Sequence, residues 1–274
     1  MLDEGRAAPA WVLRWEWAWT AALAAIALAA IPLSMGYIGL NWDALNHHIY
    51  LGWTAEHPRF GQDWLAASYQ SFQYPYLYWP AYRLAAAGTD GVTAGVVLAE
   101  LNVLVTPALS LLAAACIPGR EWFHVAMRLM SVALAFSSAV VLSMVAGTGN
   151  DLLAAIPLVW AIALSVRAVA VPGLDERALL RSAIGSAALG GIATAFKLSN
   201  GVIVVVLPLL WLWPGDAWRP RLARTVLAGL VAALAFFVAY APWGWQVWQQ
   251  TGNPFYPIAD DWLAPLRALT GWHR

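Results

Sequence analysis

Residues 17–38, WAWTAALAAIALAAIPLSMGYI, contain no charged side chain and decide the fold. A helix of about 20 apolar residues is long enough to cross the hydrocarbon core of a bilayer. This stretch is too long and too poorly flanked to be a cleaved signal peptide. The whole chain agrees, because 61% of its 274 residues are hydrophobic and only 11% are charged, whereas soluble domains carry about 25% charged residues. The sequence therefore predicts an all-α integral membrane protein.

Similar runs predict a single membrane module of about seven transmembrane helices. The expected spans are about 17–38, 92–116, 123–146, 152–171, 182–196, 201–213 and 225–243. The runs 182–196 and 201–213 are short for a bilayer core of roughly 30 Å, so one broken helix and six spans in total is the alternative. Residues 39–91 predict a large outer loop that carries interfacial helices, and residues 244–274 predict an outer carboxyl-terminal tail.

The distribution of cations favours seven spans, with the amino terminus inside and the carboxyl terminus outside. The inner side then collects ten cations, which are Arg6, Arg14, Arg120, Arg128, Arg167, Arg177, Arg181, Arg219, Arg221 and Arg224. The outer side receives five, which are Arg59, Arg83, Lys197, Arg267 and Arg274. This excess agrees with the positive-inside rule, whereas six spans would place residues 219–224 outside.

Fifteen Lys and Arg balance fifteen Asp and Glu, which argues against a nucleic-acid partner.

Polar groups at the predicted outer face are the first candidates for chemistry, because charges in membrane spans are costly and usually functional. Asp43, His47 and His48 lie directly after the first expected span. If this stretch is helical, Asp43 and His47 share one face. A carboxylate beside imidazoles suits general-base catalysis. The alternative is that Asp43 caps an interfacial helix and that the histidines are interface residues.

Two more outer positions carry candidate groups. Asn150 and Asp151 follow a glycine-rich turn, and Lys197, the only lysine, lies where two short helices are expected to meet. An ammonium group there would bind a phosphate as a point charge. The alternatives are that Asn150 or Asp151 caps a helix and that Lys197 extends its ammonium to the interface.

A metal site is an alternative to these assignments. Asp43, His47, His48 and Asp151 together offer oxygen and nitrogen ligands, but the chain lacks the ligand spacing of a zinc site. The sequence therefore predicts no cofactor and no metal ligand, with a divalent metal as the disfavoured alternative.

Five separated segments, taken in order, resemble a known family. They are Asp-x-x-x-x-His at 43–48, the aromatic and proline-rich stretch 69–82, Asn150-Asp151, residues 190–197 and Gly-Asn-Pro-Phe-Tyr-Pro at 252–257. This combination resembles bacterial members of the GT-C superfamily of membrane glycosyltransferases, which includes protein mannosyltransferases and aminoarabinose transferases. The similarity covers essentially the whole chain. Family members usually continue for several more spans, so this chain could be a minimal enzyme, a fragment or an inactive relative. A second difference is that His47 stands where family members commonly have Tyr.

The resemblance implies transfer of a sugar from a polyprenyl-phosphate carrier to a lipid, glycan or protein acceptor at the periplasmic face of the bacterial inner membrane. It implies catalytic roles for Asp43 as general base or acceptor-binding carboxylate, for His48 as its neighbour and for Asp151 as the second acid. The expected substrate-binding residues are His47, Arg59, Tyr74, Arg83, Asn150, Lys197, Asn253 and Tyr256.

Two rival functions remain beside the enzyme. One is a non-catalytic membrane subunit whose same groups bind a lipid phosphate. The other is a secondary transporter, for which the break at Lys197 is suggestive, although the chain shows no internal repeat.

Overall fold

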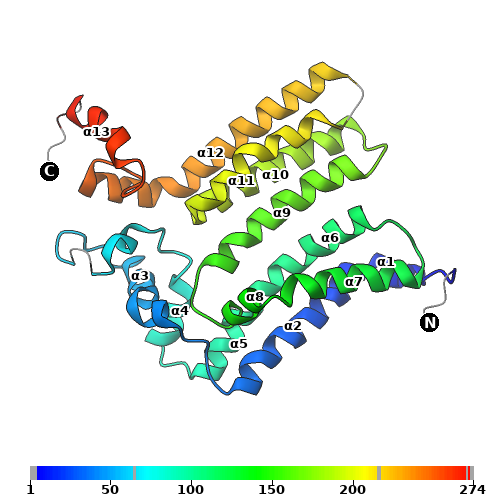
Figure 1. The fold of residues 1–274 in the computed structure, drawn as a ribbon, viewed down its shortest axis with the longest axis horizontal. Coiled ribbons are helices and arrows are strands. Elements are labelled where there is room, and N and C mark those ends of the chain that lie inside the picture. Colours follow the sequence, from blue (N-terminus) through cyan, green and yellow to red (C-terminus); the bar gives the residue numbers. More distant parts are fainter. Residues whose placement is uncertain (1–4, 64–65, 215–216, 270, 272–274) are drawn as a thin grey trace.

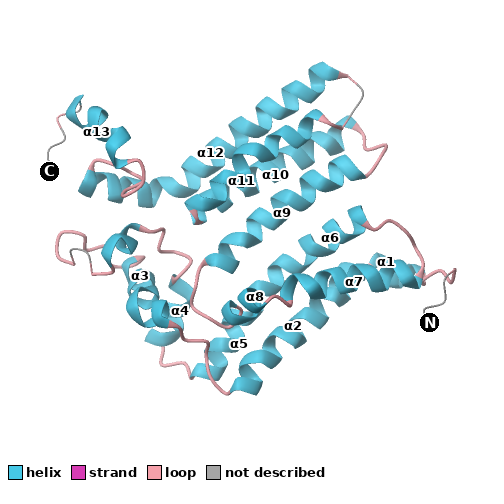
Figure 2. Ribbon diagram, viewed as in Figure 1, coloured by secondary structure: helices cyan, strands magenta, loops and turns pink. Residues whose placement is uncertain are grey.

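The computed structural model describes residues 5–63, 66–214, 217–269 and 271. Within these ranges the regular structure is helical and no β-strand is formed, which confirms the predicted all-α class (Figure 2). Five helical segments are long and apolar enough to cross a membrane. They are α2 (Glu16–Met35), the run Gly91–Cys116, α9 (Asp151–Ala170), α10 (Glu176–Phe196) and α12 (Trp218–Thr251).

The other elements are shorter. Two apolar segments, α7 (Trp122–Phe136) and the run Leu198–Leu212, fall below the length of the five. The run Gly91–Cys116 consists of α5 (Gly91–Leu101), a 3-10 turn (Asn102–Val105) and α6 (Thr106–Cys116). The remaining pieces are α1 (Ala10–Arg14), a π-helix (Ala44–His48), α3 (Ile49–Thr54), a 3-10 turn (Ser68–Phe72), α4 (Trp79–Ala86), α8 (Ala139–Met144), 3-10 turns at Leu198–Asn200 and Leu207–Leu212, α11 (Gly201–Val206) and α13 (Asp260–Leu269).

The helix boundaries differ from the expected spans for local reasons. Helix α10 has 21 residues, because it begins at the side-chain cap of Asp175 and includes charged residues that a search for uncharged runs excludes. At 1.5 Å per residue it reaches about 30 Å, so the predicted shortness of 182–196 does not hold. The expected span 123–146 is broken after Phe136, and Ser138 caps the second piece by accepting a bond from the Val141 amide at 3.2 Å.

The carboxyl-terminal part also differs from the expected layout. Helix α12 continues through the expected start of the tail at residue 244 and ends at Thr251, where Gly252 takes a left-handed conformation with φ of +67°. This conformation suits glycine because it has no Cβ. Helix α13 follows within the tail, and residues 270 and 272–274 lie outside the described residues.

Small side chains let the central helices approach closely. A Cβ added at Gly191 of α10 would come within 2.2 Å of the Ala232 carbonyl oxygen of α12, so only glycine permits this crossing. On the opposite side, Ser186 of α10 donates to the Ala161 carbonyl of α9 at 2.8 Å. Close backbone approach and interhelical hydrogen bonds are typical of packing in membranes, where burial of apolar surface gives little driving force.

The loops that connect the helices lie at two opposite ends of the helix bundle (Figure 1). Helix α1 and the α6–α7 and α9–α10 connections lie at one end, where the Ala8 amide donates to the Arg120 carbonyl at 2.8 Å. The other end, called the site end below, holds the 36–90 segment, the start of α9 and the end of α12. There the Gly39 amide donates to the Ala146 carbonyl at 3.1 Å, which ties the 36–90 segment to the turn before α9.

Candidate active site

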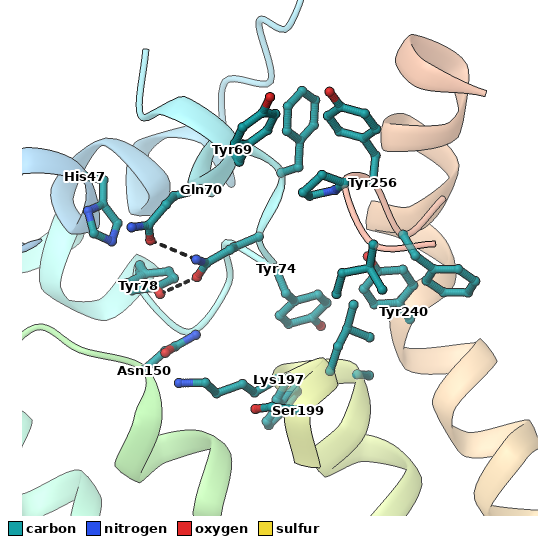
Figure 3. A pocket seen from close by; sticks show the side chains of 18 of the residues that line it. His47, Tyr69, Gln70, Tyr74, Tyr78, Asn150, Lys197, Ser199, Tyr240 and Tyr256 are labelled. Atoms are coloured by element: carbon teal, nitrogen blue, oxygen red, sulfur yellow. Dashed lines mark hydrogen bonds between the residues drawn. The ribbon is translucent and has the colours of Figure 1, made fainter. Parts of the chain in front are cut away.

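The site end contains a cavity of about 320 Å³ between four parts of the chain (Figure 3). Its walls come from the 36–90 segment, the start of α9, the junction after α10, and α12 with residues 255–258. Small-molecule sites usually have volumes of about 300–1,000 Å³. Eight residues predicted from the sequence line this cavity, which are Asp43, His47, His48, Tyr74, Asn150, Asp151, Lys197 and Tyr256.

Three predicted residues lie outside the cavity lining. Arg59 pairs with Asp63 at 3.2 Å, and Arg83 pairs with Glu56 at 3.3 Å. Asn253 is fully buried, and its side chain accepts from the Phe255 amide and donates to the Ile258 carbonyl, both at 2.9 Å. Asn253 therefore shapes the 255–258 wall from behind it.

The helical register brings Asp43 and His47 together, as their spacing predicts. Asp43 precedes the π-helix and makes no side-chain capping bond, so the capping alternative is not the observed arrangement. The Asp43 side chain is 52% exposed, and its carboxylate lies 3.9 Å from Nδ1 of His47, beyond hydrogen-bond distance. Because no hydrogen bond occupies this carboxylate within the described part of the chain, it is available to a ligand.

Both histidines are neutral near pH 7. Burial lowers the pKa of His47 below its usual value, and the charge of Asp43 only partly opposes this. Burial, followed by the neighbouring His47, lowers the pKa of His48 to about 4. Nδ1 of His48 is hydrogen-bonded to Oγ1 of Thr148 at 2.8 Å, and its ring stacks on Tyr78 with centroids 4.9 Å apart. These contacts fix the ring between the 36–90 segment and the turn before α9.

The neutral state of His48 predicts a pH-dependent stability. Its pKa is about 4 in the folded chain, whereas an unperturbed histidine has a value near 6.5. The unfolded state therefore takes up the proton first, and stabilisation present above pH 6.5 is lost as the pH falls toward 4. We expect the loss of Tm between pH 7.5 and pH 5 to be smaller in His48→Asn than in the wild type, measured by thermal unfolding in detergent.

A matched control is His57→Asn, since His57 is exposed and does not line the cavity. This variant should keep the wild-type difference in Tm. An equal pH dependence in His48→Asn and the wild type would contradict the assignment of a buried neutral His48.

Asp151 and Lys197 connect the start of α9 to the end of α10 in the cavity wall. Asp151 is the first residue of α9 and Lys197 follows the last residue of α10, and their side chains form an ion pair. Neither Asn150 nor Asp151 makes the side-chain cap that the alternative interpretation requires. The Asn200 side chain fixes the junction by donating to the carbonyls of Ala154 at 3.2 Å and Ala193 at 3.0 Å.

Aromatic side chains form the remaining wall. Tyr74 lies over Tyr240 of α12 with ring centroids 6.2 Å apart, and Phe255 lies 5.5 Å from Tyr240. Tyr240 donates to the Pro254 carbonyl at 3.0 Å, which holds the carboxyl-terminal segment against α12. The stretch 69–82 thus supplies flat surfaces to the cavity, together with the predicted Tyr256 and with Tyr240 and Phe255, which were not predicted from the sequence.

Gln70, Gln73 and Tyr78 also line the cavity and were missed individually. All three lie in the aromatic stretch 69–82. The sequence feature that could have indicated them is the pair of glutamines three positions apart within this stretch. Among the described residues, no group of three or more His, Cys, Asp or Glu side chains is arranged to hold a metal ion.

Comparison of the chain with family models, with curated proteins and with solved structures gave no match, so the interpretation of the site rests on its own residues.

Proposed function

We propose that the chain is an integral-membrane glycosyltransferase of the GT-C type, which moves a sugar from a polyprenyl-phosphate donor to an acceptor at the periplasmic face of the bacterial inner membrane. One observation carries the proposal. Asp43, Asp151 and Lys197, which are far apart in the sequence, line one cavity together with aromatic rings. A base, a phosphate-binding cation and flat apolar surfaces are the groups that such a transfer needs.

The proposed topology has seven crossings with the amino terminus inside. It combines the five long segments with the shorter segments Trp122–Phe136 and Leu198–Leu212. The site end then faces outward with Arg59, Arg83, Lys197 and Arg267, while the opposite end carries ten arginines; Arg274 lies outside the described residues. This distribution follows the positive-inside rule. Exposed apolar side chains along α12, such as Leu230 and Leu234, fit contact with lipid.

The two carboxylates have different partners and therefore different proposed roles. Asp43 has an exposed side chain, and its carboxylate takes the proton of the acceptor hydroxyl. At the same time, the acceptor oxygen attacks the anomeric carbon of the donor sugar. The bond from that carbon to the phosphate oxygen breaks, and polyprenyl phosphate leaves. Lys197 stabilises the negative charge that grows on this phosphate, and Asp151 holds the ammonium in place through their ion pair.

The role of Lys197 predicts a specific loss of phosphate binding. In Lys197→Met, farnesyl phosphate should bind at least about tenfold more weakly, because hydrogen bonds between charged groups contribute roughly 1.5–3 kcal/mol. The remaining Asp151 carboxylate would also repel the phosphate. Binding can be measured by titration of the purified chain in nanodiscs. Arg83→Met is the control, since Arg83 lies outside the cavity lining; equal weakening in both variants would contradict the assignment.

The function itself is tested with the purified wild-type chain and radiolabelled polyprenyl-phosphate mannose or arabinose, with membrane lipid, glycan or protein extracts as acceptors. The proposal expects label to move from the donor to an acceptor. Donor that binds tightly but stays unchanged after long incubation would instead favour the non-catalytic lipid-phosphate-binding subunit.

A further inference from the structure

One wall of the cavity carries a chain of side-chain hydrogen bonds to which the proposed reaction assigns no role. The Tyr78 hydroxyl donates to Oε1 of Gln73 at 2.8 Å, and Nε2 of Gln73 donates to Oε1 of Gln70 at 2.8 Å. We call Tyr78, Gln73 and Gln70 the amide strip. Figure 3 shows these bonds on the side of the cavity that also holds His47, opposite Tyr74, Tyr240 and Tyr256.

The strip is anchored at one end and open at the other. Tyr78 is 2% exposed, and burial, followed by the charges of Asp151 and Asp43, raises the pKa of its hydroxyl, so the hydroxyl stays protonated and can donate. Gln73 is exposed and Gln70 is half-buried. A primary amide has two N–H donors and two acceptor lone pairs. After the two bonds of the strip, both glutamines retain donors and an acceptor for a ligand.

A buried polar atom beside the strip lacks a partner. The His47 side chain is 3% exposed and lines the cavity, yet its Nδ1 has no hydrogen bond. Buried polar groups are nearly always hydrogen-bonded, and an unpaired one is costly. Because His47 is neutral, one of its ring nitrogens can donate and the other can accept, and the residue lines the cavity.

We infer that Gln70, Gln73 and His47 form a subsite that binds the hydroxyl groups of the donor sugar and determines which sugar is accepted. Neighbouring sugar hydroxyls both donate and accept, and amides and a neutral imidazole likewise offer donors and acceptors. The donor sugar is favoured over an acceptor sugar because its anomeric carbon lies between the phosphate bound at Lys197 and the acceptor oxygen at Asp43, and both of these residues line the same cavity as the subsite. This inference rests on the proposed function, and the subsite is the part of the site that selects the sugar.

Binding of three lipids to the purified full chain in nanodiscs tests the subsite. The probes are farnesyl phosphate mannose, farnesyl phosphate arabinose and farnesyl phosphate. The wild type should bind at least one glycosylated lipid more tightly than farnesyl phosphate. Gln73→Met and Gln70→Met keep the side-chain length but remove the amide, and each should reduce this preference by about tenfold, the effect of about one lost hydrogen bond.

The matched control is Gln62→Met, since Gln62 is an exposed glutamine of the same segment outside the cavity lining. It should keep the wild-type preference, and farnesyl phosphate should bind equally to all four proteins. Equal weakening of all three lipids in Gln73→Met would indicate a structural role and overturn the inference, as would a wild type without any preference.

The transfer assay separates this inference from the proposed function. Transfer by the wild type combined with an unchanged preference in both glutamine variants would overturn the subsite and keep the enzyme. A preference that is lost in these variants, although the wild type transfers no sugar, would support the subsite and overturn the enzyme.

Discussion

Asp43→Asn is expected to slow sugar transfer by about 10²–10⁴-fold, the usual contribution of a positioned general base. The reason is that Asp43 has an exposed side chain whose carboxylate makes no hydrogen bond among the described residues and lies 3.9 Å from the neutral His47, whereas Asp151 is engaged by Lys197. Asparagine keeps the size of the side chain but cannot take the acceptor proton. The measurement is the initial rate of label transfer, together with donor affinity, which should stay near that of the wild type.

The control for this variant is Asp63→Asn. Asp63 belongs to the same segment, pairs with Arg59 and does not line the cavity. It should retain transfer close to the wild-type rate. Full activity in Asp43→Asn would refute the base assignment, and an equal loss in both variants would point to a general disturbance of the 36–90 segment.

Arg128→Met is expected to lower the free energy of unfolding by about 3–5 kcal/mol, the usual effect of removing one partner of a buried ion pair. Arg128 of α7 is 5% exposed and binds both carboxylate oxygens of Glu16 of α2, at 2.6 and 2.8 Å. It also donates to the carbonyls of Ile117 and Gly119 at 3.0 and 3.1 Å. The variant leaves these acceptors unpaired, and the loss can be measured by equilibrium unfolding in mixed micelles.

The double variant Glu16→Met/Arg128→Met separates the pair from its surroundings. Replacing both ions by apolar side chains removes the unpaired carboxylate, so the double variant should be more stable than Arg128→Met alone. A double variant that is less stable than the single one by the full cost of Glu16→Met would show that the two residues act independently.

The position of the site was predictable because it depends on few features. Sorting the polar residues by membrane side placed Asp43, Asp151 and Lys197 at one end, and the cavity brings them together there. The shared face of Asp43 and His47 follows from helical spacing alone, since residues four apart are neighbours on a helix. Both inferences need only the order of the membrane-spanning helices and the spacing of neighbouring residues on a helix.

Features that depend on how loops fold were not predictable in the same way. Arg59 and Arg83 were expected at the site, but each is paired with an acid of its own segment. The roles of Gln70 and Gln73 depend on the path of that segment beside Tyr78. The contact of Arg128 with Glu16 joins residues 112 positions apart, and no sequence period indicates it.

The central claim is that this cavity holds the lipid-linked donor, and photocrosslinking tests it most directly. A polyprenyl-phosphate sugar with a diazirine in its first isoprene unit can be crosslinked to the chain, and the labelled peptides can be identified by mass spectrometry. We predict label on the aromatic wall, at Tyr74, Tyr240 or Phe255, that excess farnesyl phosphate mannose displaces. Label confined to exposed apolar residues of α12, such as Leu230 and Phe237, and insensitive to the competitor would contradict the account.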